Sequence, residues 1–175
     1  LYWFGRYGER CDNAARLLRV ANRELLDHVD DRPDDLAATL VLAQRFGLID
    51  GEGDPATALL HAATHPEGAL AVHLRQLSRV AFNLRDRMSN DHWRSLNRLI
   101  ADPVFRRDGL PAVRPGQALA WLDRAVTSMM TLSGFVLDGM TRGTGWRFLS
   151  LGRRIERLAN QCTAIDVAMH EGRSQ

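Results

Sequence analysis

One pattern of charged and amide side chains occurs twice in the 175-residue chain, once near each end. It reads GRYGERCDN at residues 5–13 and GRRIERLAN at residues 152–160, so both copies fit G-R-x-x-E-R-x-x-N. On a helix, residues spaced i, i+3, i+4 and i+7 lie along one stripe. The pattern therefore predicts two helical stripes of guanidinium, carboxylate and amide groups, which can pair with each other or bind an anion.

Both stripes are expected to be buried, because apolar residues continue them along each helix. In the first copy, the polar residues Arg6, Arg10 and Asn13 share an arc with Trp3, Ala14, Leu17, Val20 and Ala21. In the second copy, Arg153, Arg157 and Asn160 align with Trp146, Leu149, Ala164, Val167 and Ala168. The other side of the second helix is apolar too, at Ile155, Leu158 and Met169. We therefore expect the second helix to be surrounded on most faces.

Buried arginines need acceptors, and the two copies can supply them to each other. We expect Glu9 to accept from Arg153 or Arg157, and Glu156 to accept from Arg6 or Arg10. Four arginines then face two glutamates, which leaves positive charge unless Asp12, Asp138 or Asp166 turns inward. This surplus favours a carboxylate or phosphate ligand. The alternative is a purely structural bundle, in which buried Arg–Glu pairs only fix how the helices pack.

Glycines accompany both copies at positions where a helix would be stronger without them. Gly5, Gly8 and Gly152 each weaken a helix by about 1 kcal/mol relative to alanine. We expect a second backbone or a ligand to approach closely at these positions.

The elements that position these residues are predicted to be helices, with no segment typical of a strand. The first spans residues 2–28. Pro33 marks the first turn of the second, which runs to Phe46 and ends at Gly47. The third runs from Pro55 to about Thr64, with Asp54 as its N-cap.

Four more helices are expected in the remainder of the chain. The fourth spans residues 67–88. The fifth follows a cap at Ser89, Asn90 or Asp91 and runs to about residue 101. The sixth spans residues 117–140, and the seventh spans residues 146–169 with Thr144 as a candidate cap. A loop is expected over residues 102–116, which hold three prolines. The sequence thus predicts one all-α domain over residues 1–175, an antiparallel helical bundle of about six to seven helices with an internal pseudo-repeat of the motif helix.

Composition excludes several classes of function. All 23 basic residues are arginine, so neither a Schiff-base lysine nor a P-loop lysine is present. The net charge of +2 does not by itself favour nucleic acid, and no apolar run is long enough to cross a membrane. The six histidines lack metal-ligand spacing beyond the pair His61 and His65, so we expect neither a metal site nor a cofactor. Two isolated cysteines, Cys11 and Cys162, indicate a reducing compartment and a cytoplasmic location.

Three segments resemble one known family. LYWFGRYGER at residues 1–10, RMSNDHWRSLN at 87–97 and MTRGTGWRFLSLGRRIER at 140–157 are similar to the Alpha-E domain family, an uncharacterised bacterial α-helical group with an E-R motif. The resemblance assigns to its motif, by position, Arg6, Glu9, Arg10, Asn13, Arg153, Glu156, Arg157 and Asn160. Arg142 and Arg147 match the turn before the second copy.

The resemblance also implies partners. Members of the family accompany, or are fused to, circularly permuted ATP-grasp proteins, and they also accompany transglutaminase-like and proteasome-like hydrolases. This context implies a system that forms or cleaves amide bonds. Family domains usually extend beyond the second E-R helix, so these residues resemble a partial or trimmed copy. We expect the chain to form a homo-oligomer or to depend on a further segment.

Two functional hypotheses follow. In the first, the domain binds an anionic group at the arginine cluster for an ATP-grasp-type ligase. In the second, it is an amide-forming transferase with Glu9 or Glu156 as general base. A carboxylate beside several arginines has a lowered pKa and is a poor base at neutral pH, which favours the binding hypothesis.

Overall fold

The computed structural model describes residues 1–27, 33–105 and 113–171, which form seven α-helices and no strand. The prediction of an all-α helical bundle is therefore confirmed. The helices are α1 (Tyr2–Asp27), α2 (Pro33–Arg45), α3 (Pro55–Thr64), α4 (Ala69–Phe82), α5 (Asn90–Ile100), α6 (Pro115–Gly139) and α7 (Thr144–Glu171). Two short 3-10 helices, Arg85–Arg87 and Pro103–Phe105, flank α5. None of the described helices combines the length and the apolar character needed to cross a bilayer.

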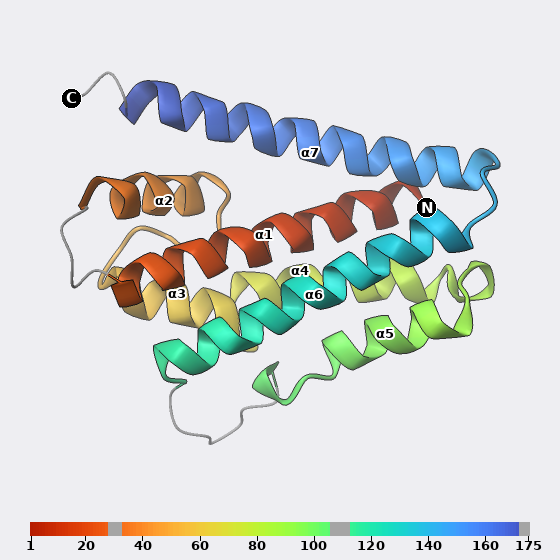
Figure 1. Ribbon diagram of the computed structural model, residues 1–175, viewed down its shortest axis with the longest axis horizontal. Helices are drawn as coiled ribbons and strands as arrows, with labels where there is room; N and C mark the ends of the chain where they lie inside the picture. Colours follow the sequence, from red (N-terminus) through yellow and green to blue (C-terminus); the bar gives the residue numbers. More distant parts are fainter. Residues whose placement is uncertain (28–32, 106–112, 172–175) are drawn as a thin grey trace.

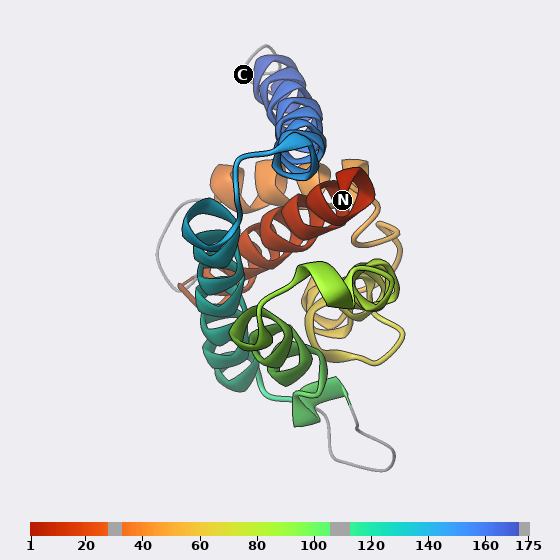
Figure 2. The same cartoon turned by 90° about the vertical axis from the view of Figure 1, so that its right-hand side faces the viewer.

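The bundle is built around α1. Helices α4 and α6 pack on one side of α1, and α7 packs on the opposite side (Figures 1 and 2). The successive helices α4, α5, α6 and α7 alternate in direction, whereas α1 and α7 run in the same direction (Figure 1). The apolar core fills the space between α1, α3, α4, α5 and α6, with Leu18, Leu59, Leu70, Leu96 and Trp121 among its fully buried side chains.

Local sequence signals fix several helix ends as predicted. Asp54 is the N-cap of α3, and its carboxylate accepts from the backbone N–H of Thr57 at 2.9 Å. Of the three candidate caps of α5, Ser89 is the N-cap, and its hydroxyl accepts from the His92 N–H. Gly47 follows α2 with a φ of +63°, a conformation that favours glycine.

The prediction of a single helix over residues 67–88 is wrong. Helix α4 spans only Ala69–Phe82, and a 3-10 turn follows it. Asn83 forms the C-cap, in keeping with the tendency of asparagine to favour helix ends. Leu84 and Met88 still pack against the core from the turn, so the apolar pattern continued where the helix did not. At the start, Gly68 is the N-cap of α4, and a Cβ atom added there would clash with the carbonyl oxygen of His61.

The predicted loop is shorter than expected, because α6 begins at Pro115, a favoured residue for a first helical turn. Likewise Thr144 is the first residue of α7 rather than its cap. The part of the predicted loop at residues 106–112, and residue 28 at the end of the first predicted helix, lie outside the described residues.

The expectation that the last helix is surrounded on most faces is also wrong. In the described structure α7 packs mainly on α1 and α2 and is the outermost helix of the bundle (Figure 2). Ile155, Leu158 and Met169 are exposed by 38%, 61% and 56%. In the first copy, Trp3 and Val20 are likewise exposed, by 54% and 43%.

Candidate functional site

The two motif helices meet at their glycines. A Cβ atom added to Gly5 would clash with the carbonyl oxygen of Leu149, and one added to Gly152 would clash with the carbonyl oxygen of Tyr2. These contacts are equivalent, because Tyr2 and Leu149 each lie three residues before the glycine of their own helix. The prediction of close backbone approach is thus confirmed at Gly5 and Gly152. At Gly8 no second backbone approaches, since the nearest atom, Leu77 Cδ1, is 4.0 Å away, and the alternative of a ligand there stays a prediction.

Next to this glycine contact, four ion pairs connect α1 and α7. Glu156 accepts from the Nε of Arg6 at 2.5 Å and from the Nε of Arg10 at 2.7 Å. Glu9 accepts from the Nε of Arg153 at 3.2 Å and from the Nε of Arg157 at 2.6 Å. Each carboxylate oxygen therefore receives one arginine of the opposite helix. The crossed pairing predicted from the repeated motif is confirmed, while its origin in an internal repeat stays a prediction.

Both carboxylates are almost completely shielded from water. The side chains of Glu9 and Glu156 are 2% and 6% exposed, whereas those of the four arginines range from 21% for Arg153 to 54% for Arg157. Burial opposes ionisation of Glu156, but the hydrogen bonds from Arg10 and Arg6 outweigh it and hold its pKa below the ordinary 4.5. An ionised, doubly paired Glu156 is a weak general base at neutral pH.

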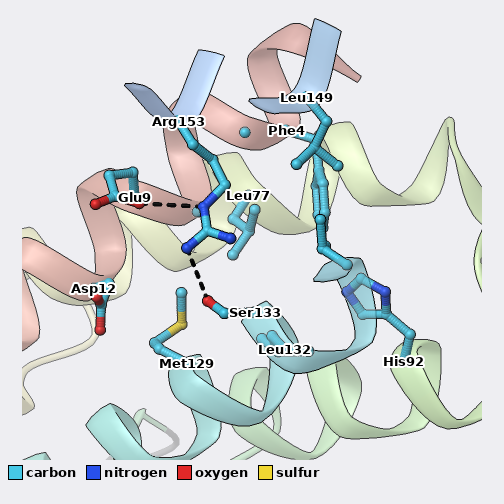
Figure 3. Close-up of a pocket in the computed structure, with 13 residues that line it drawn as sticks. Phe4, Glu9, Asp12, Leu77, His92, Met129, Leu132, Ser133, Leu149 and Arg153 are labelled. Carbon is cyan, nitrogen blue, oxygen red and sulfur yellow. Dashed lines mark hydrogen bonds and ion pairs between the residues drawn. The ribbon is translucent and has the colours of Figure 1, made fainter. Parts of the chain in front are cut away.

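The remaining nitrogens of the four arginines differ in their partners. Arg6 donates to the Tyr2 hydroxyl, and Arg153 donates to the Ser133 hydroxyl on α6 (Figure 3). Arg10 lies over the Tyr7 ring. For the terminal nitrogens of Arg10 and Arg157, no hydrogen-bond acceptor lies within the described part of the chain. These two arginines therefore have unused donors, whereas the surplus positive charge that the sequence predicts is shared by all four arginines.

Of the three aspartates considered as possible compensating charges, Asp12 is the one whose charge acts on the network among the described side chains, since, in addition to Glu9, it raises the pKa of Arg157. Asp12 pairs with Arg16 on its own helix at 3.0 Å, and its other oxygen, Oδ1, is buried without a partner. Asp166 is half exposed and lies at 4.0 Å from Arg45 on α2. The side chain of Asp138 lies outside the described residues.

Beyond the glycine contact, α1 and α7 diverge and α2 packs against both (Figure 1). Two clefts lie here. The Arg10 cleft, of about 260 Å³, is lined by Arg10, Asn13, Ala14, Arg45, Phe46, Leu48, His73, Glu156 and Asn160. The Arg157 cleft, of about 630 Å³, is more open and includes Glu9, Asp12, Arg16, Thr39 and Arg157. The motif asparagines Asn13 and Asn160 line both clefts.

The amides of these asparagines are buried donors without acceptors. The Nδ2 atoms of Asn13 and Asn160 are both inaccessible to water and have no hydrogen-bond partner in the described structure. Each such orphaned group costs about 1–3 kcal/mol. Two orphaned donors beside an arginine with free terminal nitrogens form an arrangement that matches the oxygens of an anion.

Sequence reasoning missed two residues of the Arg10 cleft. His73 on α4 and Arg45 on α2 reach it from elements outside the motif. Burial, followed by the charge of Arg10, lowers the pKa of His73, so its imidazole is neutral at physiological pH. No local pattern marked either residue, since only the packing of α2 and α4 against α1 brings them to the cleft.

The other predicted site residues lie apart from the crossing network. Arg142 is exposed and stacks over the Trp146 ring, and Arg147 is exposed in the first turn of α7. Neither forms an ion pair with the described residues of the motif. His61 and His65 stack on each other on α3, and the described residues contain no group of three potential metal ligands.

A small cavity of about 30 Å³ lies on the α6 side of the crossing, between Glu9, Arg153, Ser133 and His92 (Figure 3). Burial lowers the pKa of His92, whose Nε2 has no partner within the described structure. The volume of this cavity suits a single water molecule rather than a substrate.

Comparisons with known proteins agree with this architecture. Uncharacterized proteins of Mycobacterium tuberculosis and Mycobacterium bovis are each 31% identical to the chain over 186 residues, which cover 90% of this chain and 20% of the relative. The chain thus spans about a fifth of the length of the curated relatives it matches. No solved structure matches it significantly. In this structure the E-R residues form the ion pairs that hold α1 against α7. A family model for a predicted alpha-helical domain with a conserved ER motif matches all of residues 1–175. Because this match covers the whole chain, the chain belongs to the Alpha-E family.

Proposed function

We propose that the domain binds the carboxylate or phosphate group of a ligand in the Arg10 cleft, for a partner of the ATP-grasp type that forms amide bonds. The observation that carries the proposal is the pair of buried, unpartnered amide donors of Asn13 and Asn160 beside Arg10. The partner follows from the family resemblance noted in the sequence, and the bound group follows from the chemistry of the cleft.

Electrostatics favours an anion over a neutral ligand. Glu156 is already paired with two guanidinium groups, which leaves Arg10 with donors to spare. Arg45 is a second cation at the rim of the cleft, where Asp166 at 4.0 Å partly offsets its charge. Because His73 is neutral here, a bound anion would raise its pKa, and binding would become linked to proton uptake.

Substitution of the two asparagines distinguishes a role in ligand binding from a role in folding. Replacing Asn160 by leucine removes an orphaned donor and keeps a similar volume, so the unliganded domain should be as stable as before or more stable. The same change should weaken anion binding at least tenfold. A role in the fold alone predicts the reverse, namely a loss of stability with no effect on a ligand.

The test is a titration of the 175-residue chain and of Asn13→Leu and Asn160→Leu with inorganic phosphate, acetate, glutamate and ATP. Calorimetry gives the affinity, and the side-chain NH₂ signals of the two asparagines in a ¹H–¹⁵N spectrum report the contact. Asn97→Leu, on the exposed face of α5, is the matched control. Absence of binding by all four anions, or unchanged affinity in both variants, would refute the proposal.

A further inference from the structure

A continuous apolar stripe runs along the outer face of α7. It consists of Phe148, Leu151, Ile155, Leu158, Ile165 and Met169, which are 38–61% exposed, with the exposed Cys162 completing the series. The seven positions are separated alternately by three and four residues, which is the spacing of positions a and d in a heptad. Over 21 residue steps the stripe is about 32 Å long. An exposed apolar patch of this extent marks an interaction site.

The stripe lies opposite the motif. On a helical wheel at 100° per residue, its mean direction points about 180° away from Arg153, Asn160 and Val167, which face α1 and α2. The helix therefore has two separate faces, one committed to the crossing network and one uncovered by the described elements (Figure 2). A regular a/d seam packs against another α-helix, because knobs at these positions fit the holes between side chains of a partner helix.

The charges beside the stripe define the partner further. Arg147 and Arg154 flank it at the g positions, are both exposed, and form no ion pair within the described residues. A second copy of α7 would not neutralise them. In a parallel pair Arg147 and Arg154 would face Gly152 and Ala159, and in an antiparallel pair they would face Gln161 or Ala168. Asp166 flanks the other edge of the stripe.

We propose that the apolar stripe of α7 is the docking surface for an amphipathic α-helix that carries its own a/d seam and acidic residues along one flank. The curated relatives support a source for such a helix within one polypeptide, since four fifths of their length lies outside the part that matches this chain. The inference does not depend on the proposed anion site, because the two lie on opposite faces of α7.

The probe is a 22-residue peptide with leucine at every a and d position and glutamate at every e and g position, so that it repels itself and remains monomeric. A second peptide has glutamine in place of the glutamates and is used at concentrations at which light scattering shows it to be monomeric, because it lacks the repulsion between glutamates. Fluorescence anisotropy at low ionic strength measures binding of each to the 175-residue chain. The glutamate peptide should bind at least fivefold more tightly than the glutamine peptide.

Variants test the surface and the charges separately. Leu158→Glu should weaken both peptides at least tenfold, whereas Leu137→Glu, an exposed leucine on α6, should change neither. The double variant Arg147→Glu, Arg154→Glu should bind the glutamine peptide better than the glutamate peptide. Since all substituted residues are exposed, far-ultraviolet circular dichroism should be unchanged.

Three results would overturn the proposal. The first is absence of binding by both peptides, and the second is equal binding of the two. The third comes from light scattering of the chain alone: a dimer that Leu158→Glu converts to a monomer would identify a second copy as the occupant.

Discussion

Helices α1 and α7 carry the same motif but occupy different environments. Helix α1 has neighbours on opposite sides, with α7 at its motif face and α4 and α6 behind it. Helix α7 has neighbours on its motif face alone, and its other face is exposed. Yet Glu9 and Glu156 are almost equally buried, and each is paired with two arginines. The ion pairs therefore depend on the contact between the two motif helices rather than on what lies behind either one.

The comparison indicates that different residues of the motif have different roles. The glycine and the glutamate set the helix contact, where backbone approach and buried charge leave little freedom. The last arginine and the asparagine lie where the helices diverge, and there the terminal nitrogens of the arginine and the amide nitrogen of the asparagine have no acceptor among the described residues. The structural part of the motif and its candidate binding part are thus successive turns of the same stripe.

Among the charged residues of the motif, the largest expected effect comes from removing either glutamate. Glu9→Ala and Glu156→Ala should each destabilise the domain by about 3 kcal/mol, near the lower end for a broken buried pair because the arginines keep partial access to water. Urea denaturation followed by circular dichroism measures the change. Asp123→Ala, which breaks the exposed pair with Arg19, should cost less than about 1 kcal/mol. If Glu9→Ala proved several times costlier than Glu156→Ala, the packing behind α1 would matter more than the contact.

The glycine contact should give the next largest effect. Gly5→Ala and Gly152→Ala should each cost about 1–3 kcal/mol, because the added methyl group meets a carbonyl oxygen of the opposite helix and forces the backbones apart. Gly134→Ala is the control on α6, where the added methyl group meets nothing within 4 Å. It should stabilise the domain by up to about 1 kcal/mol, as alanine does in a helix. Thermal unfolding of the three variants distinguishes the two cases, and a gain of stability at Gly152 would contradict the close contact.

Acid should reveal the pairing of Glu156. Its folded-state pKa lies below 4.5, so its contribution to stability is present above pH 4.5 and is lost as the pH falls through that value toward the folded pKa. Burial lowers the pKa of His73 and His92 and adds a loss of stability below about pH 6.5. The parent chain is compared with Glu156→Gln, and the carboxylate itself is assessed below pH 4.5, because its charge also raises the pKa of His73 and so affects stability at higher pH. The difference in unfolding free energy between the two proteins, measured by urea denaturation from pH 7 to pH 3, should shrink below pH 4.5. A constant difference would contradict the lowered pKa of Glu156.

The crossing network could be predicted from the sequence because two independent constraints agreed. Charges within an apolar stripe require partners of opposite sign, and the second copy offered Glu156 to Arg6 and Arg10. Gly5 and Gly152 then indicated where the backbones approach. His73 and Arg45 could not be predicted, since their approach to the cleft depends on how α2 and α4 pack.

The outer face of α7 shows a different limit. Helical periodicity identified its apolar residues, but periodicity depends only on the helix and is the same for a core face and for a docking face. The same holds for the end of α4, where Leu84 and Met88 kept the apolar pattern after the helix had ended at Phe82.

The smallest expected effect sharpens the contrast between the two faces of α7. Leu158→Gln, at a position 61% exposed, should change the stability of the isolated chain by no more than about 0.5 kcal/mol, as for other surface positions. Leu149→Ala, at a position 1% exposed on the motif face, is the matched comparison and should cost about 2–5 kcal/mol. Both are measured by urea denaturation at a protein concentration of a few micromolar. A large loss for Leu158→Gln would mean that the stripe is already covered in the isolated chain, and light scattering at the same concentration would then show a dimer. An unchanged stability would mean that the stripe stabilises nothing within this chain, as the proposed docking of another helix requires.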